Sequence, residues 1–445
     1  MSEVVVVGGG MLGLVLSLRL RQQGHVVTLL EGAPAVGGLA AADEIGAVRW
    51  DRFYHVVLAQ DTRLLSLLRE IGLGDQMRWG ATRTGFYVAG TWHSMTTALD
   101  FLRFPPLSLA GKLRLGATIL AASRIRDWRS LEEVTALEWL TRWSGQRTVD
   151  AIWAPLLRSK LGANAAEASA AFIWAIIVRL YGARDPGLRR GESMGYVAGG
   201  YDRVIPVLRR FVERAGVRVV TGAMVSRVEA TTAGVAVQLG DGSRVNADDV
   251  VLTVPCPRVA AMVPGLTDAE RLRLQRVVYQ GVVCPSFLLR RPLRGYYVTN
   301  ITDGDMPFTG VIETTALVDR AETGGHHLVY LPQYLTQDDP SWGDSDASVV
   351  ARSFAGLQRM IPDLQEADIV ATRVARAREV LAVSTRRYSS ELMPPLRTSV
   401  PHVFVANTAQ IAHGTLNVHE TIGLAERAAH DLAPHLATAP EVAHV

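Results

Sequence analysis

Three closely spaced glycines near the N-terminus are well suited to bind a phosphate group. Gly8, Gly10 and Gly13 fit the pattern G-x-G-x-x-G, with Met11 and Leu12 inside it. In this pattern the first glycine permits a tight turn, the second lets the backbone approach a pyrophosphate, and the third lets a helix pack closely against a strand. The free N–H groups and partial positive charge at the start of that helix then attract the anion.

The flanking residues predict the strands and the helix that position these glycines. Residues 4–7 are an unbroken valine run, which predicts a buried strand of a parallel sheet, and residues 26–30 predict a second one. Residues 14–22 predict a helix between them. Glu31 closes the second strand, where its carboxylate can accept the ribose hydroxyls of a dinucleotide. We therefore expect a dinucleotide-binding unit and not merely a glycine-rich turn.

A second glycine pair narrows the choice of dinucleotide. Gly32 follows the acidic residue, and Gly37, Gly38 and Leu39 come a few positions later. Together with the first motif, this segment resembles a superfamily of FAD-dependent enzymes that includes amine oxidases, protoporphyrinogen oxidases, phytoene desaturases and UDP-galactopyranose mutases. The resemblance implies that FAD is the cofactor and that this loop runs along its phosphates and ribityl chain. The chain looks like a divergent, protoporphyrinogen-oxidase-like branch.

Segments in the first half of the chain extend the resemblance. Residues 48–55 stand where the family carries a D-x-G-x-H-like segment close to the isoalloxazine, although a Phe-Tyr-His run replaces the glycine here. We therefore expect Tyr54 and His55 to lie beside the flavin. Residues 199–204 look like the family's glycine-pair start of a helix. In the strand that follows, the backbone at Val225 is expected to contact the adenine edge.

The C-terminal segment supplies the last part of the expected cofactor site. A buried strand ends at Asn407, next to Thr408, where the family usually has Gly-Asp. A helix is predicted to begin near Asn417, whose side chain is a good N-cap. The resemblance places the strand end at the ribityl and phosphates. It places the helix start, with Val418 and His419, at flavin N1 and C2=O, where the helix dipole stabilises the reduced flavin.

These segments predict an α/β fold of two interleaved domains, amine-oxidase- or glutathione-reductase-like. A discontinuous Rossmann-type FAD-binding domain would comprise residues 1–85, 195–262 and 390–445. An α+β substrate-binding domain would comprise residues 86–194 and 263–389. Its first part is rich in helices, and its second part predicts a mixed or antiparallel sheet that, by the resemblance, roofs the flavin.

The resemblance implies removal of a hydride from a substrate C–H bond next to nitrogen or oxygen, or from an allylic one. Electrons would pass from the flavin to O2 or another acceptor. The candidate catalytic residues are His55, His419 and Tyr388, and Tyr330 is a further candidate for the substrate cavity.

Three alternatives stay open at this point. One is a redox-neutral flavoenzyme such as a sugar mutase, isomerase or cyclase, and another is a non-catalytic FAD-binding protein. A mutase grips a nucleotide diphosphate with arginines, for which the candidates are Arg158, Arg179, Arg373, Arg376 and Arg378. The third is an amine oxidase of secondary metabolism. Against it, residues 280–286 contain no lysine where that group usually has one, and the chain's two lysines, Lys112 and Lys160, lie in the helical region.

The composition limits which kinds of molecule the protein is expected to bind. The chain of 445 residues is 48% hydrophobic and 20% charged, which excludes a wholly disordered protein. The net charge of +3 and the lack of a block of like charge argue against a nucleic-acid partner. Two cysteines, Cys256 and Cys284, are read as core residues, and no histidine and carboxylate spacing predicts a metal. We expect a small-molecule substrate, and a homodimer is left open.

The location is expected to be cytoplasmic. The first residues carry no basic region and no small-residue cleavage site, so no secretory signal is expected. No stretch of about 18 uncharged apolar residues predicts a spanning helix. Residues 107–128 form a basic amphipathic segment that could lie on a membrane surface, but we favour a solvated surface helix.

Overall fold

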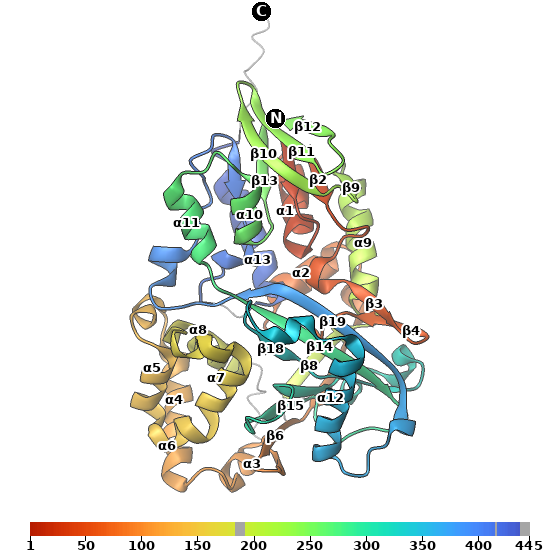
Figure 1. Cartoon of the computed structure of the whole chain (residues 1–445), viewed down its shortest axis with the longest axis vertical. Helices are drawn as coiled ribbons and strands as arrows, with labels where there is room; N and C mark the ends of the chain where they lie inside the picture. The colour runs from red at the N-terminus through yellow and green to blue at the C-terminus, as the bar shows by residue number, and fades with distance from the viewer. Residues whose placement is uncertain (183–191, 414–415, 437–445) are drawn as a thin grey trace, which may run out of the picture.

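The computed structural model describes residues 1–182, 192–413 and 416–436. The described chain forms two regions, one above the other in Figure 1. We call residues 1–85, 195–262 and 390–436 the cofactor half, whose main sheet and covering helices lie at the top of that view. We call the described parts of 86–194 and 263–389 the substrate half, most of which lies at the bottom. Its segment α11 (Asp268–Arg276) instead lies at the upper left, against the cofactor half. The first and last described segments both lie in the cofactor half.

A parallel sheet forms the centre of the cofactor half. Within the described residues it has five strands, which are, in spatial order, β20 (Val403–Val405), β13 (Asp249–Leu252), β1 (Glu3–Val7), β2 (Val26–Glu31) and β9 (Arg218–Thr221). The predicted strands at 4–7 and 26–30 are thus confirmed, and they pair in parallel. Their unbroken valine and leucine runs follow from burial on both faces.

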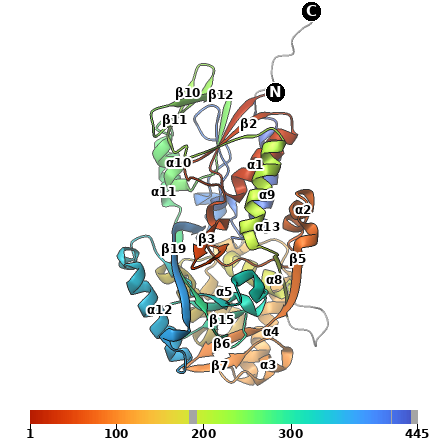
Figure 2. The same cartoon turned by 90° about the vertical axis from the view of Figure 1, so that its right-hand side faces the viewer.

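Helices cover one face of this sheet, and a smaller sheet with two helices covers the other. Val4 and Val6 face α1 (Met11–Gln22), α2 (Thr62–Glu70), α9 (Gly200–Arg214) and α13 (Val418–Leu432). Figure 2 shows α1, α9 and α13 side by side. Val5 and Val7 face the other layer. That layer consists of β10 (Val225–Thr231), β11 (Gly234–Leu239), β12 (Arg244–Ala247), α10 (Cys256–Met262) and α11 (Asp268–Arg276).

Two local predictions can be compared directly with these elements. Helix α1 begins at Met11, three residues before the predicted start at residue 14, because Gly10 is already its N-cap. The last glycine of the motif therefore lies in the first turn of the helix. The predicted hairpin over an Asp-Gly turn is confirmed, since β11 and β12 pair in antiparallel fashion.

The substrate half contains a mixed sheet, as predicted. Among the described residues it has eight strands, and β6 pairs with β15 in parallel while the other pairs are antiparallel. Its path is β18 (Gln333–Leu335), β14 (Tyr279–Leu289), β17 (His327–Tyr330), β16 (Gly310–Glu313), β15 (Val298–Ile301), β6 (Thr84–Val88) and β7 (Thr91–Ser94), and β19 (Ile369–Ala382) pairs with the free edge of β14. Helix α12 (Asp346–Met360) packs beside it, and the boundary expected after residue 85 falls inside β6.

The other part of the substrate half is helical, at the lower left of Figure 1. Its helices are α3 (Ala98–Arg103), α4 (Leu109–Arg124), α5 (Ala136–Ser144), α6 (Gln146–Thr148), α7 (Ala154–Leu161) and α8 (Ala170–Gly182). Two short pairs, β3 (Ala42–Ile45) with β4 (Val48–Asp51) and β5 (Met77–Thr82) with β8 (Glu192–Val197), connect the halves. The helices between residues 98 and 182 confirm the prediction that the first part of the substrate half is rich in helices.

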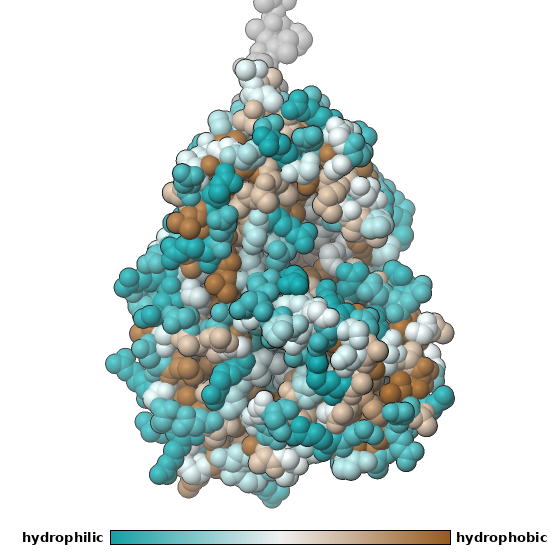
Figure 3. Space-filling view, viewed as in Figure 1, coloured by the Kyte–Doolittle hydropathy of each residue, from teal (hydrophilic) through white to brown (hydrophobic). Residues whose placement is uncertain are grey.

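The surface differs from one helix to another. The face shown in Figure 3 is mostly hydrophilic, with hydrophobic residues in separate patches. Helix α4, expected as a solvated surface helix, buries Leu115 and exposes Leu109, Leu113 and Leu120 on its other side. Through the described ranges, none of the helices has both the length and the apolar character needed to cross a membrane.

Candidate functional site

The first glycine loop has the geometry that its sequence predicts. Gly8 has a φ of +110°, which a residue with a side chain rarely adopts, and its N–H donates to the Leu30 carbonyl at 2.8 Å. A Cβ on Gly13 would lie 1.8 Å from the Gly8 carbonyl oxygen. Helix α1 can therefore approach strand β1 only because position 13 is glycine.

Gly10 is different, because a Cβ added there would meet no protein atom within 4 Å. The open space lies at the N-terminus of α1, where Gly10 is the N-cap and no side chain accepts a hydrogen bond from the first turn among the described residues. Backbone N–H groups of Met11 and Leu12 are thus left for a ligand. Open space next to uncapped N–H groups fits a pyrophosphate.

The second glycine loop lies directly against the first. The Gly37 N–H donates to the Gly9 carbonyl at 2.8 Å, and a Cβ on Gly38 would lie 3.2 Å from the Gly10 Cα. Gly37 and Gly38 both have positive φ values, +126° and +56°. The two loops therefore form one continuous backbone surface, as a cofactor that runs along both of them requires. Leu39 continues this surface into the packing around Trp50 and Tyr54.

Glu31 holds the first loop in place. Its two carboxylate oxygens accept hydrogen bonds from the Gly9 N–H at 2.6 Å and the Ala33 N–H at 2.7 Å. Next to it, a Cβ on Gly32 would lie 2.7 Å from the Met224 Cε. Each carboxylate oxygen has a further lone pair, so these bonds are compatible with the expected ribose contact, which stays a prediction.

The C-terminal strand end is tied to the protein itself. The Asn407 side chain is buried, accepts from the Ala409 N–H at 3.1 Å and donates to the Val254 carbonyl at 2.9 Å. Thr408 begins the short turn that Asn407 caps. The amide expected to bond to the ribityl therefore joins the ends of β13 and β20. The expected contacts of Asn407, Thr408 and Val225 with FAD stay predictions.

The start of α13 matches its prediction. Asn417 is the N-cap, and its side-chain oxygen accepts from the Glu420 N–H at 3.0 Å. Val418 packs partly against the core. The two ring nitrogens of His419 each lie 3.3 Å from Arg63, one from its backbone N–H and one from its guanidinium. Arg63 thereby fixes the imidazole against the start of α2.

The segment of residues 48–55 joins both halves. Asp51 is buried, and its carboxylate accepts from the Tyr201 N–H at 2.7 Å, next to Gly200. The other Asp51 oxygen lies 3.5 Å from His55 Nδ1, which has no hydrogen-bond partner in the described chain. The His55 ring packs on Tyr201 with 4.6 Å between centroids. Asp51, His55 and the glycine-pair helix start are thus brought together from positions about 150 residues apart.

A small enclosed cavity lies beside His55. It measures about 20 Å³, enough for one water molecule, and Asp51, Tyr201, Thr314 and Tyr330 also line it. The Thr314 hydroxyl is buried and unpartnered within the part of the chain that the structure describes. A water in this cavity would satisfy both His55 and Thr314.

Tyrosines form the wall next to this segment. The Tyr54 and Tyr334 hydroxyl groups lie 2.8 Å apart, and the Tyr330 hydroxyl donates to the Asp51 carbonyl at 2.6 Å. Burial raises the pKa of Tyr54 and of Tyr330 well above the usual value. Burial also raises the pKa of the nearby Cys284 thiol to about 12, so this cysteine is a neutral core residue, as expected.

Tyr388 lies elsewhere than its candidate catalytic role suggests, and Lys160 lies near an aromatic ring that its sequence position did not predict. Tyr388 is buried in the core of the cofactor half, and its hydroxyl donates to the Ala409 carbonyl at 2.8 Å. Lys160, which the sequence placed only in a helical region, lies with its Nζ 5.5 Å from the centre of the Tyr334 ring. The rarity of lysine in this arginine-rich chain is the one sequence signal that singled out Lys160.

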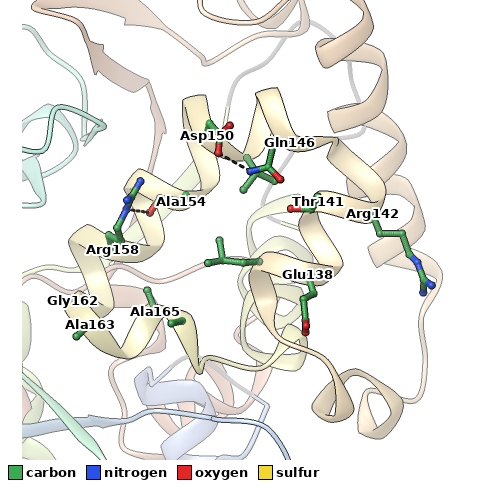
Figure 4. Close-up of a pocket in the computed structure, with 13 residues that line it drawn as sticks. Glu138, Thr141, Arg142, Gln146, Asp150, Ala154, Arg158, Gly162, Ala163 and Ala165 are labelled. Atoms are coloured by element: carbon green, nitrogen blue, oxygen red, sulfur yellow. Dashed lines mark hydrogen bonds between the residues drawn. The ribbon is translucent and has the colours of Figure 1, made fainter.

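A larger cavity, of about 740 Å³, lies within the helical region (Figure 4). It is lined only by residues between 137 and 166, including Glu138, Arg142, Asp150 and Arg158. None of the glycine loops reaches it, so we do not assign it to the cofactor. Across the described ranges, no group of three or more His, Cys, Asp or Glu side chains is placed to hold a metal ion.

Comparison with known proteins matches the chain to a family of flavin-containing enzymes. The model of the flavin-containing amine oxidoreductase family matches residues 12–433. AofH of Mycobacterium tuberculosis, which carries the name of a flavin-containing monoamine oxidase, is 27% identical over 58% of this chain. A coproporphyrinogen III oxidase of Mycobacterium bovis is 25% identical over 61% of it. This chain spans 58% and 63% of the lengths of these two relatives.

Solved structures show the same fold. A protein from Exiguobacterium, which carries the name of a protoporphyrinogen oxidase, superposes with a TM-score of 0.76 and 18% identity over 97% of this chain and 98% of that one. The fold is therefore that of FAD-binding flavoproteins of this type. The chain belongs to the flavin-containing amine oxidoreductase family, and its cofactor is FAD.

Proposed function

We propose that this protein is an oxidoreductase that removes a hydride from a C–H bond of a small, largely apolar metabolite. The bond lies next to nitrogen or oxygen, or is allylic, and O2 or another acceptor takes the electrons. FAD, when bound, supplies the hydride acceptor. The chain's own residues bind the cofactor, position the substrate and exclude water.

The buried tyrosine wall carries this proposal. Tyr54, Tyr297, Tyr330 and Tyr334 pack with Trp50 in one cluster beside the segment expected at the flavin. Tyrosine hydroxyls are protonated near neutral pH, and burial raises the pKa of Tyr54 and Tyr330 further. They therefore act as neutral hydrogen-bonding groups and not as bases. A neutral aromatic wall suits hydride removal, which needs little base, from an apolar substrate.

The ends of the flavin would be held by backbone and helix termini. The two adjoining glycine loops fit its phosphates, and the α13 N-terminus, capped by Asn417, offers partial positive charge at the other end. Arg63 holds His419 in this first turn. That charge supports electron uptake without a dedicated acid.

Four of the five arginines considered for the mutase alternative are engaged by other groups of the protein. Arg179 pairs with Asp61 at 2.6 Å, and Arg373 donates to four backbone carbonyls. Arg376 pairs with Asp346, and Arg378 packs on Trp342. These four arginines, all within the described part of the chain, form no free cluster that would grip a diphosphate, which favours the oxidoreductase over the mutase.

The names of the relatives also support an oxidase over a mutase, since both refer to oxidation. The purified protein should be yellow and should release FAD on acid treatment. A panel of apolar amines, alcohols and alkenes, mixed anaerobically, should include compounds that bleach the oxidised flavin band, and O2 should restore it. A colourless protein that takes up no FAD, or turnover only after photoreduction with no net redox change, would overturn the proposal.

A further inference from the structure

The two lysines of this chain lie in contrasting places. Lys112 is on the outer helical region, where its Nζ donates to the Leu102 carbonyl at 2.7 Å and so caps the end of α3. Lys160 has no carboxylate partner within the described residues, and its Nζ lies 5.5 Å from the centre of the Tyr334 ring. It is also only partly exposed. The charge of Lys160 therefore has no counter-ion in the described chain and is available to an anionic ligand.

Lys160 faces inward because of its position on α7. Residues two apart on a helix are separated by about 200°, so Lys160 and Arg158 point to opposite sides. Arg158 lines the open cavity of Figure 4 and donates to the Ala154 carbonyl at 3.3 Å. The side with Lys160 packs against β18, and Gly162 approaches Thr336 just beyond that strand.

Further hydrogen-bond donors lie at the same junction. The Asn164 side chain, four residues after Lys160, donates to the Gln280 side-chain oxygen at 3.2 Å. The Gln280 Nε2 group is buried and has no partner among the described residues. Gln280 is two residues from Val282, which pairs with Tyr334 across β14 and β18. The Lys160 ammonium, the unpaired Gln280 amide and the Tyr54–Tyr334 hydroxyl pair thus belong to adjoining positions of α7, β14 and β18.

The chemistry of these groups selects the ligand. Lys160 offers only donors and a positive charge, and Gln280 offers two free N–H groups. The Tyr54 and Tyr334 pair shares one hydrogen between its oxygens and can donate the other. A carboxylate accepts from all of these, whereas a protonated amine would be repelled by Lys160 and would find few acceptors.

We propose that Lys160 anchors a carboxylate of the substrate at this junction, with the Tyr54–Tyr334 pair and Gln280 as additional donors. The substrate is then an apolar acid whose body lies along the tyrosine wall and whose charged end lies between α7 and β18. This assignment rests on the proposed function for the position of the flavin, and it names the substrate class for that same site. It excludes polyamines as good substrates.

Binding of simple probes to the FAD-loaded protein tests the anchor without turnover. Benzoate and its neutral isostere benzamide are titrated by calorimetry and by the flavin difference spectrum. We expect benzoate to bind about 10-fold more tightly than benzamide, as a charge-assisted contact predicts. Lys160→Met should remove this preference and leave benzamide binding unchanged, while Lys160→Arg should retain most of it. Lys112→Met is the matched control and should behave as the wild type.

Chemical labelling gives a second reading on the unmutated protein. Because the chain has only two lysines, acetylation of each is resolved by mass spectrometry. Saturating benzoate should protect Lys160 and leave the labelling of Lys112 unchanged. This experiment stays decisive even when Lys160→Met fails to fold.

Several outcomes would overturn the anchor. These are equal benzoate affinity in Lys160→Met and the wild type, equal labelling of Lys160 with and without benzoate, or benzylamine that binds more tightly than benzoate. The proposed function fails separately, when no compound reduces the flavin. Flavin reduction by a substrate that Lys160→Met handles as well as the wild type would keep the oxidoreductase and reject the anchor.

Discussion

The cofactor-binding surface and the contacts between the two halves, which we call the joint, are formed in opposite ways. In the cofactor half, the binding surface is backbone from residues 8–13 and 31–39, close together in sequence and shaped by glycine. At the joint, contacts are made by side chains from segments more than 100 residues apart. Examples are Arg179 with Asp61, and Tyr54 with Tyr334.

This difference separates the residues that control cofactor binding from the residues that control substrate choice. Backbone loops bind the part that all dinucleotides share, because N–H groups and helix termini do not depend on residue identity. Side chains at the joint can differ between relatives without loss of the fold, so they are the place where substrate choice is expected to reside. Variants at the joint should therefore leave FAD binding intact, and variants in the glycine loops should leave the side-chain contacts at the joint intact.

The largest effects are expected at the first glycine loop. Gly13→Val places a side chain where the Gly8 carbonyl lies, so β1 and α1 must separate, and we expect a loss of about 3 kcal/mol or more with little folded protein. Gly10→Val points into open space, so we expect a folded apoprotein that binds no FAD. Thermal melting and flavin absorbance after purification measure the two properties.

Gly116 provides the control for this pair, since a Cβ there also meets no protein atom, on a helix far from the loops. Gly116→Val should keep both fold and FAD. Full FAD content in Gly10→Val would contradict the assignment of this open space to the pyrophosphate.

The next effect is expected at the joint, from the ion pair of Arg179 with Asp61. Asp61 is almost fully buried, and both of its oxygens accept from the guanidinium, at 2.6 and 3.0 Å. Arg179→Ala leaves an unpaired buried carboxylate, which costs about 3 to 5 kcal/mol. Urea unfolding should show this loss, and Asp61→Asn combined with Arg179→Met should recover part of it. Equal stability of the single variant and the wild type would show that the joint does not depend on this pair.

Asn407 distinguishes a structural role from a cofactor role. Asn407→Ala leaves the Val254 carbonyl and the Ala409 N–H without their partner, and we expect a loss of about 1 to 3 kcal/mol. FAD affinity, measured by flavin fluorescence, should change less than the free energy of unfolding. The reverse pattern would place this amide at the ribityl chain, as the family resemblance implies.

The smallest effect is a pH dependence at a second contact across the joint. His413 stacks on Trp128 with 4.5 Å between ring centroids, and burial lowers its pKa below the usual 6.5. The unfolded chain therefore binds more protons as pH falls below about 6.5, so stability is present above that pH and lost as pH decreases toward the folded-state pKa. His413→Phe keeps the stacked ring and cannot titrate. Thermal melts from pH 7.5 to 5.5 should show a weaker dependence in this variant, and an unchanged profile would assign the titration to another group.

Much of the cofactor half could be predicted from the sequence. The valine run, the glycine spacing and Glu31 each act over a few residues, and the strands and the N-cap at Asn417 were confirmed. The start of α1 was predicted three residues late, because Gly10 caps the helix inside the motif. The partners of Tyr388 and Asn407 were not predictable, since each bonds to backbone that only the folded chain brings near.

What the sequence by itself determined was the cofactor and the class of fold, because backbone loops and strand patterns are encoded locally. The tertiary structure alone decided which side chains meet at the joint and between the two parts of the substrate half. Lys160 stands 174 residues before Tyr334, and neither lies in a motif. Their contact depends on how α7 packs on β18, and no local periodicity carries that information.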